Sequence, residues 1–206
     1  MKDLGDMERR IFEAADALFG ERGFDGVSAG DIARAAGVNK ALIFYYFRSK
    51  EALYERVLAR YYAAHEAALA PALAGHRDPA ARVHALIDSY LDFIDAHRRY
   101  ARMVQRQLTS GGDHDRVRAG LTGLYRSIEA ALAGLVPGDG PLAARHFFVT
   151  IAAAVINYFT YAPALGDVWG GDPLAAAALA ERRAHLHWLA DALLAALRRE
   201  TAPKEA

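Results

Sequence analysis

The sequence predicts an all-α protein, and three observations support this fold class. Ala and Leu, the strongest helix formers, number 45 and 23 among the 206 residues. Apolar residues recur at three- and four-residue spacing over long stretches, and no run of alternating polar and apolar residues is long enough for a strand. The seven Pro and most of the 17 Gly cluster in short breaks between these stretches.

The composition limits the possible function classes. Hydrophobic residues make up 53% of the chain and charged residues 24%, which allows a sizeable core and excludes wholesale disorder. Lys and Arg together number 25, as do Asp and Glu, so any contact with nucleic acid must come from a local basic patch. The chain has no Cys, which excludes disulfides and thiolate metal sites. The first ten residues lack the apolar segment of a secretory signal, so we expect a cytoplasmic protein.

Apolar periodicity places the helices along the chain. The clearest stretch is 79–97, in which six apolar residues share one face, namely Val83, Leu86, Ile87, Tyr90, Leu91 and Ile94. Breaks are expected at 20–26, 37, 48–49, 75–79, 110–113, 136–141 and 162–173. The helices predicted between them are 7–19, two short helices within 28–47, a connecting helix from Ser49 past Tyr62, then 79–97, 115–135, 141–162 and 173–199.

One apolar stretch approaches the length of a membrane span. Residues 147–165 carry no charge. However, the stretch contains Asn157, two Thr and Pro163, and Arg145 and His146 precede it directly. We therefore expect a helix buried in protein and no membrane partner.

Residues 28–47 have the features of a helix-turn-helix. Ser28 and Asp31 have the spacing of a capping box at the start of the first short helix. Gly37 can adopt the left-handed conformation that ends this helix, and Asn39 is a good N-cap for the second. Ala33 is a small residue where the two helices would cross. From Ile32 to Lys50 there are four cations and no acid, the cations being Arg34, Lys40, Arg48 and Lys50.

With these residues in place, the stretch from Arg10 to Leu53 resembles the N-terminal DNA-binding domain of the TetR/AcrR transcriptional regulators. The resemblance lies in AADALFGERGFDGVS, IARAAGV and YYFRSKEAL. It implies a three-helix DNA-binding domain over residues 1–52 and a ligand-binding and dimerisation domain of about six helices over residues 53–206, so about nine helices in all. It also implies a homodimer that binds a palindromic DNA operator and is released by a small-molecule effector, with no cofactor and no enzymatic activity.

The resemblance assigns DNA-contacting roles to eight residues. Asn39 and Lys40 would read base edges, and Ala41 and Leu42 would contact thymine methyl groups. The remaining four would contact phosphates, namely Ser28, Tyr45, Tyr46 and Lys50. The chain departs from the family where it has Asn39 in place of Ser or Thr and Phe44 in place of Tyr. On charge alone, Lys40, Arg48 and Lys50 are better interpreted as solvated surface. With the surrounding motif we favour DNA contact for Lys40 and Lys50, and Arg48 could be either.

The second half of the chain mixes polar groups into apolar helices, which suits a mostly apolar effector pocket, an ordinary core or a dimer seam. Gln107 and Asn157 are the foremost pocket candidates, because buried amides need hydrogen-bond partners. The full set expected to line a pocket is Tyr90, Phe93, Met103, Gln107, Tyr125, Phe147, Asn157, Tyr158, Tyr161 and Trp169.

The other groups of polar residues in the sequence do not predict a metal site or a catalytic site. His84, Asp88 and Asp92 share a helix face, which we interpret as a solvated face rather than a metal site, because no further ligand can be assigned. HExxH, P-loop and GxSxG motifs do not occur in the sequence.

The last two long helices, about 141–162 and 173–199, are too apolar for a monomer surface, and we expect them to form the dimer interface. The favoured function is a ligand-responsive transcriptional regulator, most often a repressor. The alternatives are a ligand-independent or activating regulator of the same fold, an all-α enzyme, and a helical module that binds a protein partner.

Overall fold

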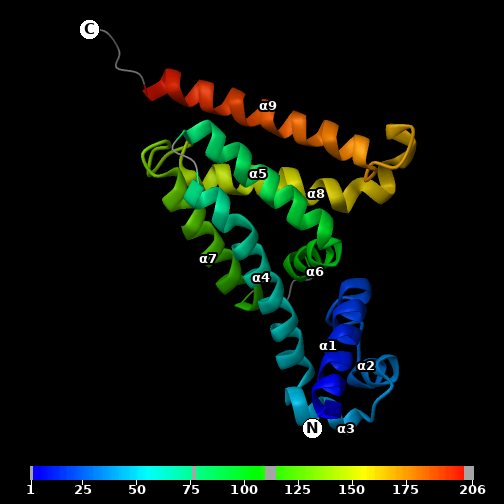
Figure 1. Cartoon of the computed structure of the whole chain (residues 1–206). Coiled ribbons are helices and arrows are strands. Elements are labelled where there is room, and N and C mark those ends of the chain that lie inside the picture. Colours follow the sequence, from blue (N-terminus) through cyan, green and yellow to red (C-terminus); the bar gives the residue numbers. More distant parts are fainter. Residues whose placement is uncertain (1, 76–77, 110–114, 202–206) are drawn as a thin grey trace. The chain divides into compact units, whose positions relative to one another are not determined.

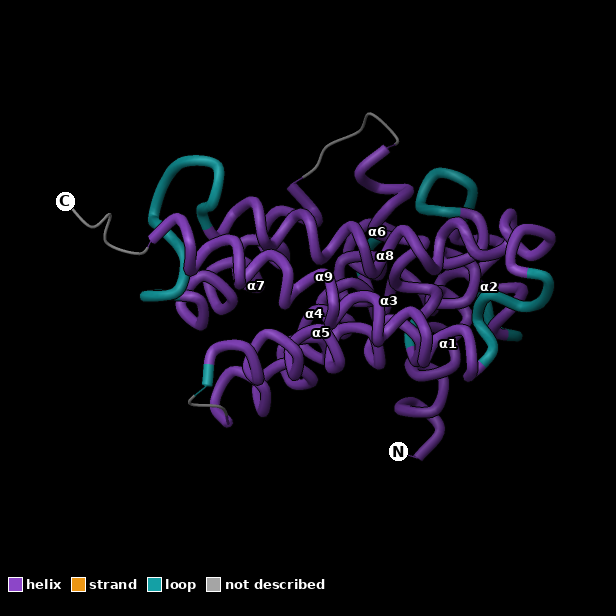
Figure 2. The backbone as a smooth tube through the Cα atoms, turned by 90° about the horizontal axis from the view of Figure 1, so that it is seen from above, coloured by secondary structure: helices purple, strands orange, loops and turns teal. Residues whose placement is uncertain are grey.

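The computed structural model describes residues 2–75, 78–109 and 115–201. Within these ranges the chain forms nine helices, and Figure 2 shows that helices and loops account for all of it. The only β-type pairing in the described part is an isolated bridge between Ala133 and Val136. The all-α class predicted from the sequence is therefore confirmed.

Figure 1 labels the helices in chain order. Their bounds are α1 (Lys2–Arg22), α2 (Ala29–Ala36), α3 (Lys40–Phe47), α4 (Lys50–Gly75), α5 (Pro79–Ala96), α6 (Arg98–Thr109), α7 (Asp115–Leu132), α8 (Ala144–Trp169) and α9 (Ala176–Thr201).

The chain divides into two compact units, and the division does not follow the sequence order. The first unit contains residues up to Ala64 together with His97–Leu121, so α6 belongs with α1, α2, α3 and the start of α4. The second unit contains His65–Ala96 and the chain from Thr122 onward. The functional division at residue 52 stays a prediction, and each unit is described by itself below.

Local capping fixes both short helices of the first unit. Ser28 Oγ accepts a hydrogen bond from the Asp31 N–H, and the Asp31 carboxylate accepts one from the Ser28 N–H, which is the expected capping box. Gly37 ends α2 with φ 64° and ψ 40°, the left-handed conformation that favours glycine. Asn39 caps α3 through its Oδ1, which accepts the Ala41 N–H at 2.9 Å.

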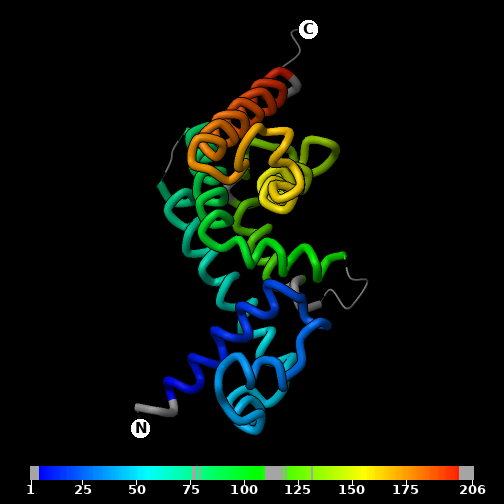
Figure 3. The backbone as a smooth tube through the Cα atoms, turned by 90° about the vertical axis from the view of Figure 1, so that its right-hand side faces the viewer, coloured from blue at the N-terminus to red at the C-terminus, as the bar shows by residue number. Residues whose placement is uncertain are grey.

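The core of the first unit forms where α1 crosses the helix-turn-helix and the start of α4. In Figure 3, α1 lies across α2 and α3, which are the blue segments near the N-terminus. Ala33 is 5% exposed, as the crossing position requires. The fully buried apolar side chains of this core are Ile11, Phe19, Ile32, Ile43, Leu53 and Val57. Their burial fixes which side of α3 faces inward and therefore which side is presented to solvent.

The second unit is organised around α5, which packs against both α8 and α9 (Figures 1 and 3). Val83, Leu86, Ile87, Leu91 and Ile94 are buried, which confirms the helical face predicted for 79–97. A second cluster joins α4, α5 and α7 through Leu69, Ala72, Leu86 and Leu124.

Three helices differ from the sequence prediction. The helix α1 is longer than the predicted 7–19, because it begins at Lys2 and continues through Gly20 to Arg22. The helix α6 was not predicted as a separate element, since no Gly or Pro separates it from α5 and the chain turns at His97. The break predicted at 162–173 is wrong in its first half, because α8 continues through Pro163 to Trp169. Pro163 is exposed, as is Pro71 inside α4, so each ring projects toward solvent and neither helix ends there. The break predicted at 110–113 lies outside the described residues.

The apolar helix α8 is long and apolar enough to cross a membrane by length and composition alone. The sequence analysis predicted a helix buried in protein, with a dimer interface along it. In the single chain 22% of its most apolar 18-residue window is buried, because α5 covers one side and much of the rest faces solvent. Burial of the remaining surface against a second copy stays a prediction.

The Ala33 crossing can be tested by overpacking. The variant Ala33→Leu should lower the free energy of unfolding by about 1–3 kcal/mol, because three extra carbons have no space between the helices. Chemical unfolding followed by circular dichroism measures the effect. Ala35→Leu, at an exposed position of the same helix, is the matched control and should change stability by less than about 0.5 kcal/mol. Equal destabilisation by both variants would contradict this role of Ala33.

Candidate nucleic-acid interface and buried ion-pair clusters

The solvent-facing side of α3 carries the candidate nucleic-acid contacts. Ile43 and Phe47 point inward and are buried. Five exposed residues then follow at helical spacing along the opposite side, namely Lys40, Ala41, Phe44, Tyr45 and Arg48 at the C-cap. We call these five the outward stripe of α3. Tyr45 is 73% exposed and Phe44 is 44% exposed, and the Lys40 ammonium lies 5.9 Å from the centre of the Phe44 ring.

Leu42 and Tyr46 lie beside the stripe and are only partly exposed. The Tyr46 hydroxyl oxygen is buried and has no hydrogen-bond partner among the described residues. Burial is the main cause that raises the pKa of Tyr46, followed by the charges of Tyr45 and Glu8. A phosphate contact by Tyr46, which we predicted, requires this side chain to turn outward, whereas Tyr45 can make one as it stands.

Asn39, Ser28 and Lys50 are exposed or partly exposed, and each already holds the fold together. The Oδ1 of Asn39 is used in the helix cap, which leaves the two N–H donors of its amide for a base edge. Ser28 Oγ donates to Asp31 Oδ2 at 2.6 Å. Lys50 Nζ donates to the Phe24 carbonyl at 3.0 Å and lies 3.9 Å from the centre of the Phe24 ring, so it ties the start of α4 to the loop after α1.

The link between α3 and α4 is unusually tight. Arg48 has φ 66° and ψ −46°, and it is the one described residue other than Gly with positive φ. The Ser49 N–H donates to the Phe47 carbonyl at 2.7 Å across Arg48, so this residue is the centre of a γ-turn. Ser49 Oγ then accepts the Ala52 N–H and caps α4, as predicted. Such a backbone costs a non-glycine residue about 1–3 kcal/mol.

A buried carboxylate connects three helices of the first unit. Asp16 of α1 is 6% exposed and accepts a hydrogen bond from the Tyr61 hydroxyl of α4 at 2.6 Å. The guanidinium groups of Arg60 and Arg99 lie 3.2 and 3.5 Å from its other oxygen. A buried carboxylate is tolerated where cations and donors surround it, so the Asp16 cluster fixes α1, α4 and α6 as one body.

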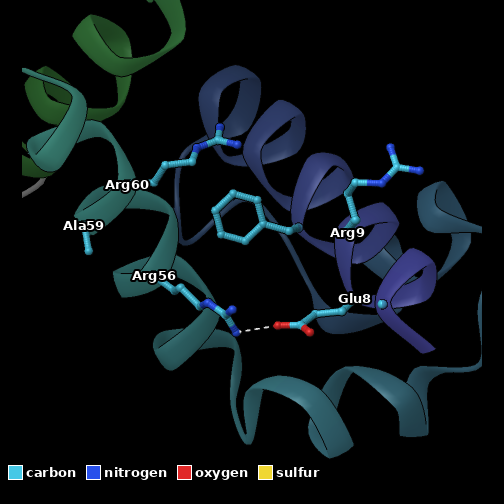
Figure 4. A pocket seen from close by; sticks show the side chains of 7 residues that line it. Glu8, Arg9, Arg56, Ala59 and Arg60 are labelled. Carbon is cyan, nitrogen blue, oxygen red and sulfur yellow. Dashed lines mark ion pairs between the residues drawn. The ribbon is translucent and has the colours of Figure 1, made fainter. Parts of the chain in front are cut away.

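A groove of about 580 Å³ opens between α1 and α4 (Figure 4). Its lining is Gly5, Glu8, Arg9, Phe12, Arg56, Ala59 and Arg60. The arginines are matched by acids: Arg56 pairs with Glu8 at 2.7 Å, as the dashed line in Figure 4 shows, Arg60 with Asp16, and Arg9 with Asp6 and Glu13. The described part of this groove therefore offers an anionic ligand no unpaired arginine.

The ten residues predicted to line an effector pocket are spread over both units, and none lines this groove. In the first unit, Gln107 is buried and its Oε1 lies 3.5 Å from the Tyr54 hydroxyl, while Met103 is buried beside it on α6. The chain thus supplies the partner that we expected a ligand to supply. This pair was missed because 53 residues separate its members.

The other eight candidates lie in the second unit. Tyr90 and Phe93 both stack on the ring of His65, a buried residue that the sequence analysis did not single out. Tyr158 is buried, as is Phe147, and its hydroxyl donates to the Pro173 carbonyl, while the Trp169 ring packs against its edge. The remaining candidates range from partly to largely exposed, namely Tyr125, Asn157, Tyr161 and Trp169. Whether they line a pocket stays a prediction.

The face formed by His84, Asp88 and Asp92 is not simply solvated, which corrects our interpretation. It meets α9, where Arg183 pairs with both carboxylates and His187 Nε2 lies 2.7 Å from Asp88. The rings of His84 and His187 stack in parallel, 4.2 Å between centroids. Among the described residues no group of three or more His, Asp or Glu could hold a metal ion. Parallel rings cannot aim both lone pairs at one ion, which explains this result.

Tyr61 makes the Asp16 cluster sensitive to alkaline pH. Burial, and then the hydrogen bond to Asp16, raise the pKa of Tyr61 from 10.0 to about 12. The unfolded chain loses this proton first, so the stability present below about pH 10 falls as the pH rises toward about 12. Tyr61→Phe should make this decline shallower, measured by chemical unfolding at about pH 8 and about pH 11. Tyr45→Phe, at an exposed position, should leave the decline unchanged, and an equal change in both variants would contradict the assignment.

Comparison with known proteins identifies the family. The sequence profile described as "Bacterial regulatory proteins, tetR family" matches residues 11–57, which contain α2, α3 and most of α1. The HTH-type transcriptional regulator RutR of Escherichia coli (strain K12) is 30% identical over 169 residues, which cover 79% of this chain and 78% of RutR. A protein of Bacillus subtilis (strain 168) named "Probable HTH-type transcriptional regulator YttP" is 32% identical over 102 residues, and the chain spans about half the length of YttP.

The fold agrees with this result. The structure of the transcriptional regulator FadR from Bacillus subtilis, in complex with stearoyl-CoA, superimposes with a TM-score of 0.65 over 92% of this chain and 96% of FadR, at 16% identity. This likeness concerns the fold alone. The helix-turn-helix of α2 and α3, the match to RutR and the shared fold support one conclusion. This chain belongs to the TetR family of DNA-binding transcriptional regulators, not to a class of enzymes.

Proposed function

We propose that the protein is a ligand-responsive transcriptional repressor that binds a palindromic operator as a homodimer and is released by a largely apolar small molecule. The observation that carries the proposal is the outward stripe of α3. The caps and the buried side chains of the helix-turn-helix hold α3 at a fixed angle to α2. A regulator acting on DNA in a bacterium works in the cytoplasm. An activator, or a regulator that needs no ligand, is the alternative within the same family.

We assign the reading of operator bases to the N-terminus of α3. Lys40 is exposed and begins α3, so it can enter the major groove and reach the acceptors of a guanine. Asn39 offers its amide N–H groups to an adjacent base. Ala41 and Leu42 can contact thymine methyl groups, and Ser28, Tyr45, Tyr46 and Lys50 are assigned to phosphates. Two copies of α3 about 34 Å apart would meet successive major-groove faces.

The homodimer is proposed to form through α8 and α9. Their solvent-facing sides carry most of the large exposed apolar residues described in the chain, namely Val149, Tyr161, Val168, Trp169 and Trp188. A monomer rarely leaves such a surface in water. Burial against a second copy would remove it and would also explain why α8 resembles a membrane span by composition.

A ligand would regulate this dimer only if it binds better to one arrangement of the two DNA-binding heads than to the other. The proposed ligand site lies among the candidate residues of α5, α7 and α8 in the second unit. That FadR was solved with stearoyl-CoA makes a long-chain acyl thioester a sensible first compound to test. A compound that raises the melting temperature but leaves operator affinity unchanged would contradict the coupling.

The decisive experiment is selection from random-sequence DNA with the purified full-length protein. We expect a palindrome whose half-sites are about one helical turn apart. Recovery of no consensus sequence would contradict specific readout. A consensus without a palindrome would contradict the dimer while leaving the role of α3 intact.

Lys40 and Lys50 should differ in what they contribute to binding. Lys40→Ala should weaken operator binding by about 1–3 kcal/mol and relax the preference at one base pair per half-site. Lys50→Ala should weaken binding to all sequences alike and also lower stability, since it releases the Phe24 carbonyl. Competition binding against operator variants, with a salt titration for each protein, separates the two. The assignment is wrong if Lys40→Ala loses affinity for random DNA as strongly as for the operator.

Trp188 provides a test of the dimer interface. It is 64% exposed on α9 in the single chain, and Trp is among the residues that most often anchor an interface. Trp188→Glu should therefore shift sedimentation from dimer to monomer and weaken operator binding. Glu181→Gln, an exposed polar change on the same helix, should leave the dimer intact. A monomeric wild-type protein would contradict the proposed assembly directly.

A further inference from the structure

The turn between α3 and α4 holds an arginine in a backbone conformation that arginine does not favour. Arg48 has φ 66° and ψ −46°, and the hydrogen bond from the Ser49 N–H to the Phe47 carbonyl closes the γ-turn around it. Positive φ brings the Cβ of an L-residue close to its own backbone, whereas Gly adopts it without strain. Where φ is positive elsewhere in the described part of the chain, the residue is Gly, as at Gly23, Gly37 and Gly170.

No contact of the Arg48 side chain with the described part of the chain compensates for this strain. The Arg48 side chain is exposed. Other arginines of the first unit have partners: Arg34, Arg56 and Arg60 pair with carboxylates, and Arg10 donates to the Ala36 carbonyl. Among the described residues, no carboxylate lies within ion-pairing distance of the Arg48 guanidinium, and no protein acceptor receives a hydrogen bond from it. A strained residue with a free charged group indicates a role outside the chain.

The place of Arg48 on α3 indicates what it meets. Lys40 and Arg48 mark the two ends of the outward stripe, eight residues apart. At 1.5 Å per residue this separation is about 12 Å along the helix axis. The major groove of B-DNA is also about 12 Å wide. When Lys40 at the start of α3 is among the bases, Arg48 at its C-cap therefore lies at the rim of the groove, where the phosphates are.

We propose that Arg48 binds a DNA phosphate at the rim of the major groove, and that its strained conformation is retained because Gly, which fits this turn, carries no charge. The inference rests on the proposed DNA-binding mode of α3. It adds a phosphate contact that the sequence analysis left undecided. It also predicts opposite effects on stability and on DNA binding at one position.

Three substitutions separate charge from strain. Arg48→Gln keeps the strain and removes the charge, so affinity for operator and for random duplex should fall alike, by about tenfold. The slope of log affinity against log salt should become shallower by about 0.9 for each phosphate that the variant no longer neutralises. Arg48→Lys should retain the slope. Arg48→Gly should bind as weakly as the Gln variant yet melt about 2–4 °C above it. Arg34→Gly, at a helical position, should instead melt lower than wild type.

The outcomes distinguish this inference from the proposed function. If wild-type protein binds its selected operator while Arg48→Gln binds equally well with an unchanged salt slope, the phosphate contact is wrong and the proposed function stands. Loss of preference at a single base pair would make Arg48 a base reader and would also overturn the inference. An Arg48→Gly variant no more stable than Arg48→Gln would refute the strain argument. Failure of wild-type protein to bind any duplex would refute the proposed function itself.

Discussion

The angle between α2 and α3 depends on one residue that has no side chain. Gly37 has positive φ, and a Cβ built there would lie 2.8 Å from the Arg10 guanidinium. That guanidinium must come close, because it donates to the Ala36 carbonyl at 2.6 Å and so satisfies the end of α2 from α1. A side chain at residue 37 would strain the turn and displace Arg10 together. The direction in which α3 presents its outward stripe follows from this contact between three helices.

Around α3, some residues serve both the fold and the proposed contact with DNA. Asn39 and Lys50 each hold a backbone group in place while standing at the surface that would meet a duplex. Their remaining hydrogen-bonding capacity is therefore presented from a fixed position, which lowers the entropy lost when DNA binds. Among the described contacts, the side chains of Lys40, Tyr45 and Arg48 make no such hydrogen bond to the backbone. These three residues can therefore be replaced at little cost to the fold.

Sequence reasoning succeeded where the controlling residues are neighbours. The capping box, the left-handed Gly37 and the Asn39 cap act within four residues, so their pattern predicts their geometry. It failed where partners are distant. The pairing of Asp88 with Arg183 spans 95 residues, and its helix face therefore looked solvated. The continuation of α8 through Pro163 depends on which side of the helix faces water, and a local rule about proline does not contain that information.

The neutral charge of the chain constrains how this regulator can bind DNA. Because Lys and Arg are balanced by Asp and Glu, long-range attraction to a duplex is small, and non-specific affinity must come from few contacts. In the first unit, acids of α1 are paired with arginines of α4, as in the Glu8–Arg56 and Asp16–Arg60 pairs. The segment from Ile32 to Lys50 contains no acid at all. Affinity should therefore depend on directed contacts from α3 and its ends, and sequence preference should contribute a large share of it.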